Sequence, residues 1–245
     1  MATLATMEAL LKLELGINTA YVDIAIADSL RLVRSEELWF NGGRYSFTTV
    51  DGVYQYPLPK DFLGMRGKVY CTIGGDTSNG RRSLQPSTPD EVEELLYTGI
   101  DYDSTQTTGV AGRYAVDLLD KVMLIGPIPS TSEDLISFKY TRDLGTPSYS
   151  VSATSSTPPS VSPTVTMLGP DGQTLPTSFT TAWFDEGFKL IKERSTFELW
   201  SRFHGGTEEA SGKAQQAMIR YLEELRRLRN ENAMQLSNVR VRRHL

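Results

Sequence analysis

The sequence predicts an α+β protein, and three observations support this. Apolar residues recur every three or four positions near both ends of the chain, they alternate with polar residues in the middle, and a long stretch rich in Ser, Thr and Pro precedes the C-terminal helices. We expect a long N-terminal helix and a C-terminal antiparallel helical hairpin to form a bundle (1–43 and 178–236). The rest comprises a central antiparallel β domain with one short helix (44–144), a long Ser/Thr/Pro loop or arm (145–177) and a basic C-terminal tail (237–245).

Helical spacing predicts two helices at the start of the chain. The first runs from Thr6 to Leu15, and Gly16 can end it. The second runs from Thr19 to Leu38 and carries a stripe of apolar residues at helical spacing, namely Val22, Ile26, Leu30 and Val33. Such a stripe is typical of packing against a core or another helix.

The stretch from Trp39 to Phe62 predicts a β-hairpin. Trp39 and Phe40 close the preceding helix, and Asn-Gly-Gly breaks it. Alternating side chains from Tyr45 to Thr49 predict a strand, and Asp-Gly at 51–52 is typical of a two-residue hairpin turn. Tyr54 and Tyr56 then run back, until Pro-Leu-Pro at 57–59 ends the pairing, because proline has no N–H to donate.

The rest of the central segment predicts four strands and one helix. The strands are Lys68 to Ile73, Arg113 to Asp117, Lys121 to Ile125 and Leu135 to Thr141. Cys71 is expected to be a small buried hydrophobe, and Arg81 and Arg82 to be solvated loop charges. The sequence Thr-Pro-Asp-Glu from Thr88 is a capping box, which predicts a short acidic helix ending near Tyr97.

Residues Gly145 to Thr177 leave two interpretations open. This stretch lacks charge and large side chains, so it cannot pack a core of its own. It is either a floppy insertion, or an extended arm or hairpin that is ordered only against a neighbouring subunit or a tail protein. In the second case its partner-facing strand residues would be Val161, Val165, Met167 and Leu168. An arm of this kind would suit an assembly protein.

Helical spacing returns at Thr181 and predicts an antiparallel pair of helices. The first helix ends at His-Gly-Gly (204–206), and Thr207 caps the second. The basic tail that follows is either a frayed end that aids solubility or a docking peptide. In the docking case it would add as a strand or extended peptide to an acidic groove on another subunit, through Val239, Arg240, Val241, Arg242, Arg243, His244 and Leu245. Direct DNA binding by three arginines is a weaker alternative.

Composition argues against metal, cofactor or membrane chemistry. Two histidines and one cysteine do not build a His/Cys metal site, and no G-x-S-x-G, H-E-x-x-H or G-x-G-x-x-G motif occurs. No apolar run approaches the roughly 20 residues that span a bilayer, and the N-terminus does not read as a secretory signal. We therefore expect no cofactor, no metal and no membrane partner, while an enzyme that uses two carboxylates from distant segments stays open at this point. The net charge of −5 also disfavours a tight grip on nucleic acid.

Several of these motifs together resemble the head-to-tail adaptor (connector, or neck) proteins of tailed bacteriophages. The shared order is a long helix, then W-F-N at Trp39, F-T-T at Phe47 and Y-x-L-P-x-D-F at Tyr56. Further likenesses are L-x-G-P-I-P at Leu124, I-x-F-x-Y at Ile136 and the closing helices around Trp183. The chain departs from the pattern at Gly-Arg-Tyr (112–114) and in its long Ser/Thr/Pro insertion.

The resemblance implies a non-enzymatic virion protein located at the neck and synthesised in the host cytoplasm. Adaptor subunits form a ring, commonly twelvefold, between the portal protein and a downstream tail or nozzle protein. The ring lines the channel through which genomic DNA passes without sequence recognition, and an acidic lumen would let DNA slide. The C-terminal segment grips the portal, and this role would fall here to Val239 through Leu245. Two alternatives are a tail-tube or baseplate component, and a cellular interaction module or unrecognised enzyme, for which a buried, strongly shifted carboxylate in a cleft would argue.

Overall fold

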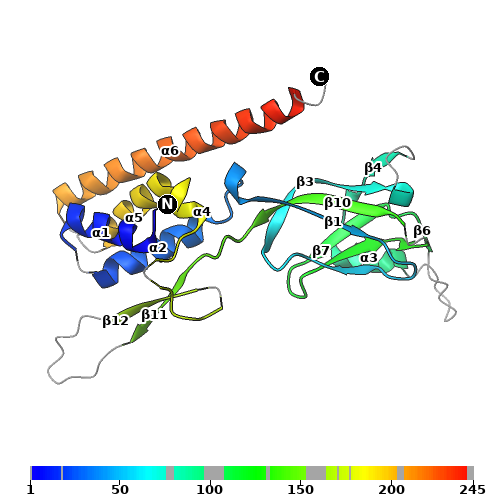
Figure 1. Ribbon diagram of the computed structural model, residues 1–245, viewed down its shortest axis with the longest axis horizontal. Helices are drawn as coiled ribbons and strands as arrows, with labels where there is room; N and C mark the ends of the chain where they lie inside the picture. Colours follow the sequence, from blue (N-terminus) through cyan, green and yellow to red (C-terminus); the bar gives the residue numbers. More distant parts are fainter. Residues whose placement is uncertain are drawn as a thin grey trace. The chain divides into compact units, whose positions relative to one another are not determined.

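The computed structural model describes residues 2–17, 19–75, 80–96, 108–130, 133–152, 164–169, 171–176, 178–202 and 207–241, and beyond Met234 only the backbone of the last helix. The described residues form a mixed α+β fold with six α-helices and several mainly antiparallel sheets, so the expected α+β class is confirmed at this level (Figure 1). The chain divides into a helical unit (Met1–Asn41 with Asp143–Leu245) and a β unit (Gly42–Arg142).

The helical unit contains five α-helices and a β-ribbon. The helices are α1 (Leu4–Leu15), α2 (Thr19–Val33), α4 (Ala182–Asp185), α5 (Phe188–Arg202) and α6 (Glu208–Val241). A capping box between Thr3 and Thr6 starts α1, and Gly16 ends it in a left-handed conformation with φ 65°. The single helix predicted after Thr181 is interrupted between α4 and α5. A Cβ at Gly187 in this gap would lie only 2.9 Å from the Trp183 ring.

Buried apolar side chains from all five helices form the core of this unit. Trp183 lies at its centre, 1% exposed, and meets Phe40 edge to face with ring centroids 5.0 Å apart. The other large buried members include Met7, Leu11, Ile26, Leu30, Phe184, Leu190, Ile191, Leu199 and Leu228. The stripe predicted on the second helix, Val22 to Val33, lies in this core, as expected.

The second helix ends earlier than predicted. Helix α2 stops at Val33, and Trp39–Asn41 forms a separate 3₁₀ turn. The buried side chain of Asn41 explains this, because its Oδ1 accepts a hydrogen bond from Leu38 N (3.0 Å) and its Nδ2 donates to Glu36 O (2.8 Å). Backbone groups that would otherwise continue the helix are satisfied here by one side chain.

The β unit contains two four-stranded sheets. The first has the order β1-β10-β3-β4, with β1 (Gly42–Thr48), β3 (Phe62–Thr72), β4 (Arg81–Ser83) and β10 (Leu135–Arg142). The second has the order β2-β8-β7-β5, with β2 (Gln55–Pro57), β5 (Gln85–Pro86), β7 (Arg113–Asp117) and β8 (Val122–Gly126). Two short strands, β6 (Thr108–Gly109) and β9 (Ile128–Pro129), pair in parallel, and η2 (Ile73–Gly75) is a 3₁₀ turn.

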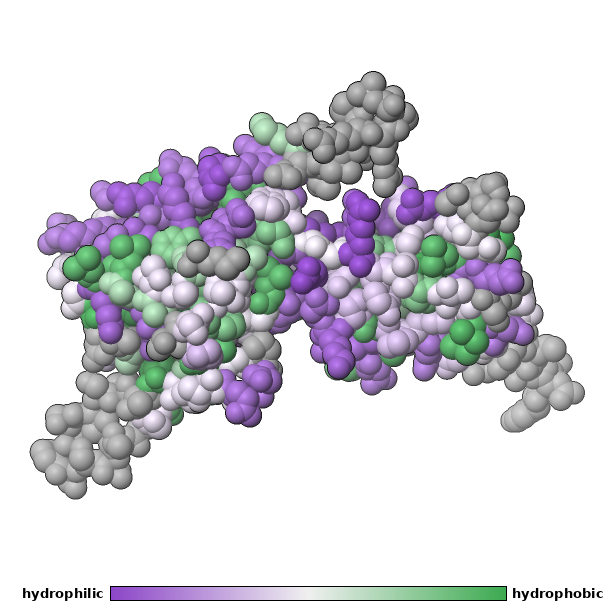
Figure 2. All heavy atoms as spheres, in the orientation of Figure 1, coloured by the Kyte–Doolittle hydropathy of each residue, from purple (hydrophilic) through white to green (hydrophobic). Residues whose placement is uncertain are grey.

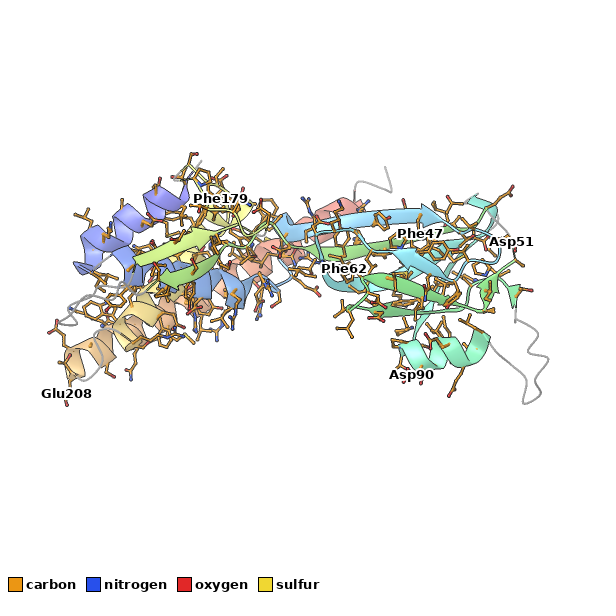
Figure 3. The ribbon with its side chains drawn as sticks, turned by 90° about the horizontal axis from the view of Figure 1, so that it is seen from below. Phe47, Asp51, Phe62, Asp90, Phe179 and Glu208 are labelled. Atoms are coloured by element: carbon orange, nitrogen blue, oxygen red, sulfur yellow. The ribbon has the colours of Figure 1, made fainter. Side chains whose placement is uncertain are left out.

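The predicted hairpin across Asp51-Gly52 is wrong. A turn is present there, and Figure 3 labels Asp51 in it, but β1 pairs with β10 and β2 pairs with β8. The Tyr56 hydroxyl holds the turn, donating to Val53 O (2.8 Å) and accepting from Val50 N (2.9 Å). The Phe47 and Tyr56 rings stack with centroids 4.4 Å apart, so the two strands meet through side chains of facing sheets.

Most predictions of single elements in the β unit are confirmed. Strand β7 has the predicted bounds, and β8 and β10 agree to within a residue or so, whereas β3 begins six residues earlier than expected. The capping box of α3 (Pro89–Leu96) is confirmed, since Glu91 N donates to Thr88 Oγ1 and Thr88 N donates to Glu91 Oε2. Figure 3 shows Asp90 at the start of this helix, beside the strands. Cys71 is fully buried, as expected.

The Ser/Thr/Pro segment contains a two-stranded ribbon. Strand β11 (Ser148–Ser152) pairs antiparallel with β12 (Thr164–Leu168), and α2 contacts both strands. An isolated bridge between Leu168 and Thr174 extends β12 on its other side. The ribbon is therefore ordered against this chain's own helices. The predicted strand residue Val161 lies outside the described residues.

Candidate functional site

The predicted docking tail begins as a helix. Helix α6 continues to Val241, so Val239, Arg240 and Val241 have helical backbone, which corrects the expected strand or extended peptide. Arg242, Arg243, His244 and Leu245 lie outside the described residues. Valine lowers helix propensity only slightly, and arginines in a last helical turn favour the negative end of the helix dipole. The long helix that precedes Val239 therefore outweighs two β-branched residues.

Helix α6 extends well beyond its last described residue in the core of the helical unit. Leu228 is the last residue of α6 in the core, and two polar contacts follow, Arg229 to Glu36 (2.6 Å) and Asn232 Nδ2 to Glu37 O (2.9 Å). Met234 is then 65% exposed. At about 1.5 Å per residue, the backbone from Asn232 to Val241 extends the helix by roughly 14 Å. Figure 2 shows mainly hydrophilic residues along the outer side of α6.

The residues predicted to form a partner-facing arm differ in their burial. Met167 is only 7% exposed and packs into the helical core of this chain, so its side chain is not available to a partner. Val165 and Leu168 are half-buried. The most exposed strand is β11, in which every side chain is exposed, and Tyr149 and Val151 are its large ones. The contact of these residues with another protein stays a prediction.

A cavity of about 230 Å³ lies between α1, α5 and α6. Leu15, Trp200 and Ala217 supply its apolar part, and Lys213 and Arg220 supply cationic groups. The Lys213 ammonium lies 4.5 Å from the centre of the Trp200 ring and also pairs with Glu209 at 2.6 Å. The cavity combines an aromatic face with positive charge, which could receive an acidic or apolar side chain. Sequence reasoning missed it because helix packing brings these residues together.

A second cavity, of about 420 Å³, lies in the β unit and is lined by Arg82, Ser83, Gln85, Leu95, Gly112, Arg113, Gly126 and Pro127. The prediction that Arg81 and Arg82 lie in a loop is wrong, although both residues are exposed, as expected of solvated charges. Both belong to β4, where Arg81 lies 3.9 Å over the Tyr70 ring and Arg82 donates to Ala111 O at 2.5 Å. These arginines hold the sheet to its neighbours, which reduces their value as ligand-binding groups.

The described carboxyl group with the most strongly raised pKa lies between α1 and α2. Burial, together with the charge of the nearby Glu8 and a hydrogen bond with it, raises the pKa of Asp23 to about 7, against a smaller opposing effect of Lys12. Burial also raises the pKa of Glu8, while its hydrogen bond with Asp23 lowers it. Asp23 Oδ1 is buried without a hydrogen-bond partner. Because neither carboxyl lines the two cavities above, this pair does not fit a catalytic cleft.

No group of three or more His, Cys, Asp or Glu residues that could hold a metal ion occurs within the described ranges. Within the same ranges, no helix has the length and apolar character needed to cross a membrane. No protein-family model and no curated protein matches the chain.

Proposed function

We propose that this chain is a structural, non-enzymatic virion protein that acts as a head-to-tail adaptor of a tailed bacteriophage. Its copies form a ring, expected to be dodecameric, between the portal and a tail or nozzle protein, and the ring lines the DNA channel. The chain resembles such adaptors in the motifs from Trp39 to Phe62, from Leu124 to Tyr140 and around Trp183.

The observation that carries the proposal is the continuation of α6 to Val241, well past its last described core residue, Leu228. The last turns of this helix lie in a basic segment that contains Arg240. It is well suited to insertion into a partner. Many copies in a ring, each making a modest contact, would attach tightly through avidity.

The test is removal of Ser237–Leu245. The truncated chain should keep its fold and its melting temperature, because the last described core residue of α6 is Leu228, yet it should no longer co-sediment with purified portal rings. A full-length variant with Arg240, Arg242 and Arg243 changed to Gln separates charge from length. It should bind more weakly, and with less dependence on salt, than the unaltered chain. Undiminished co-sedimentation of the truncated chain would refute portal docking through this segment.

A tail-tube or baseplate component is the second candidate, and the ordered β11–β12 ribbon favours it. In that case the ribbon would contact a tail protein, and deletion of Ser237–Leu245 would leave incorporation into tails unchanged. Neither the full-length chain nor the truncated chain would then co-sediment with portal rings.

A further inference from the structure

The first sheet of the β unit ends in an edge strand of seven residues. Strand β1 pairs with β10 on one side, and no described strand pairs with its other side. Open edges of this length are uncommon in proteins that remain monomeric, because their unpaired N–H and C=O groups can capture another strand.

The register shows which backbone groups of β1 face outward. Thr49 N donates to Asp134 O at 2.8 Å, which continues the register that places Thr48 opposite Leu135. Residues that exchange hydrogen bonds in an antiparallel pair alternate with residues that do not. Tyr45 and Phe47 therefore bond to β10, whereas Arg44, Ser46 and Thr48 direct their N–H and C=O groups to the open edge. The side chains of these three residues are also exposed.

The ribbon of the helical unit has a second open edge. Gly169 N donates to Gln173 O (2.8 Å) and Leu175 N donates to Met167 O (3.0 Å), so residues 167 and 169 bond away from β11. Thr166 and Leu168 must then bond to their β11 partners Ser150 and Ser148. By alternation, Tyr149 and Val151 direct their backbone groups to the open side. Their side chains are 36% and 52% exposed.

We propose that β11 of one copy of this chain pairs with the open edge of β1 in a second copy. Two different edges, both present in every copy, make a heterologous contact, and repetition of such a contact closes into a ring when the rotation allows. Residues that bond to each other across strands share one face of the sheet. Tyr149 and Val151 would thus lie beside the side chains of Arg44, Ser46 and Thr48, where the Arg44 guanidinium can stack on the Tyr149 ring.

This pairing would also stabilise the ribbon, because a two-stranded hairpin is only marginally stable alone and a third strand changes that. The inference rests on the proposed function in that it supplies the contact between neighbouring subunits of the ring. It does not depend on what the ring binds.

Proline substitution tests the pairing without breaking the sheet. Ser46→Pro and Val151→Pro each remove an N–H that faces the open edge, and proline is tolerated on edge strands in this orientation. The matched controls Ser46→Thr and Val151→Thr keep the N–H. We expect both proline variants to fold, as judged by circular dichroism, and to need on the order of fivefold more protein to form rings, since about 1 kcal/mol is lost per missing hydrogen bond. Rings that form equally well with both proline variants would overturn the inference.

Disulfide cross-linking tests the same contact with milder changes. Single cysteines at residues 44, 46 or 48 of one sample are mixed with single cysteines at 149 or 151 of another, while the native Cys71 stays buried. At least one mixed pair should form a covalent dimer on oxidation, because directly opposed residues lie within disulfide reach. Two results would contradict the inference: cross-links that form only between two β1 cysteines, or no cross-link in any mixture although rings form.

The two proposals can fail separately. Mixed cross-links without portal binding would leave the strand pairing intact and remove the adaptor role. Portal-bound rings without mixed cross-links would support the adaptor role and remove the strand pairing.

Discussion

Replacement of Asp23 by Asn should make the protein more stable near neutral pH and flatten part of its pH dependence. Asp23 is 7% exposed, and burial beside Glu8 raises its pKa from 3.8 to about 7. A carboxyl whose pKa is higher in the folded state holds its proton more tightly there, so folding is favoured at low pH. The contribution of Asp23 to the free energy of unfolding is fully present below pH 3.8 and is lost as the pH rises through about 7.

The magnitude follows from the difference between the two pKa values. At about 1.4 kcal/mol for each pKa step, the contribution lost between low pH and pH 7 is at most ~4 kcal/mol. Because Glu8 shares the proton with Asp23, we expect about half of this, ~2 kcal/mol. Asparagine imitates the protonated carboxyl and can still donate a hydrogen bond to Glu8 at every pH.

The assay is urea unfolding of the unaltered chain and the Asp23→Asn variant from pH 3.5 to pH 8. The variant should match the unaltered chain near pH 3.5 and exceed it by ~2 kcal/mol at pH 8. Comparison of the two chains removes the titration of all other groups. Asp120→Asn, at an exposed turn residue, is the matched control and should show no such difference. A stability difference that stays constant over this pH range, or that grows toward low pH, would refute the reasoning.

Three further predictions concern stability. Trp183→Ala removes the largest side chain of the helical core and should lower the free energy of unfolding of that unit by about 3–5 kcal/mol, measured in urea, whereas Leu119→Ala at a 94% exposed turn should change it little. Glu224→Gln should lower the free energy of unfolding by about 1–2 kcal/mol at pH 7, because this carboxylate is buried and pairs with Arg227 (2.6 Å) and Lys189 (3.3 Å). Both ion pairs lower the pKa of Glu224, so this loss should vanish as the pH falls well below 4.5. Unfolding measured at pH 3 and at pH 7 checks this. Gly212→Ala adds a Cβ that meets nothing within 4 Å inside helix α6, and should raise the melting temperature through a gain of about 1 kcal/mol. A loss of stability in this variant would show that Gly212 is needed for a reason other than intrachain packing.

Features that depend on neighbouring residues in the sequence could be predicted. The capping box from Thr88 to Glu91 involves groups three residues apart, and the strand from Arg113 to Asp117 has the predicted bounds. The apolar stripe of α2 likewise indicated a buried face before any partner was known.

Features that depend on residues far apart in the sequence could not be predicted. The pairing of β1 with β10 joins residues about ninety positions apart, whereas Asp-Gly at 51–52 suggested a partner a few residues away. The Asp23–Glu8 pair and the Lys213–Trp200 contact exist only because helices pack against each other. The open edges of β1 and β11 follow from the strand register of a sheet and of a ribbon, and composition and periodicity do not contain this register.

Electron microscopy of the purified chain mixed with portal rings from the same source tests the central claim most directly. A second ring should be stacked on each portal, with the same rotational symmetry axis and with density for α6 entering the portal. The stack should be lost when Ser237–Leu245 are removed. A well-folded chain that leaves the portal rings bare, or that binds them equally well without this segment, would contradict the account.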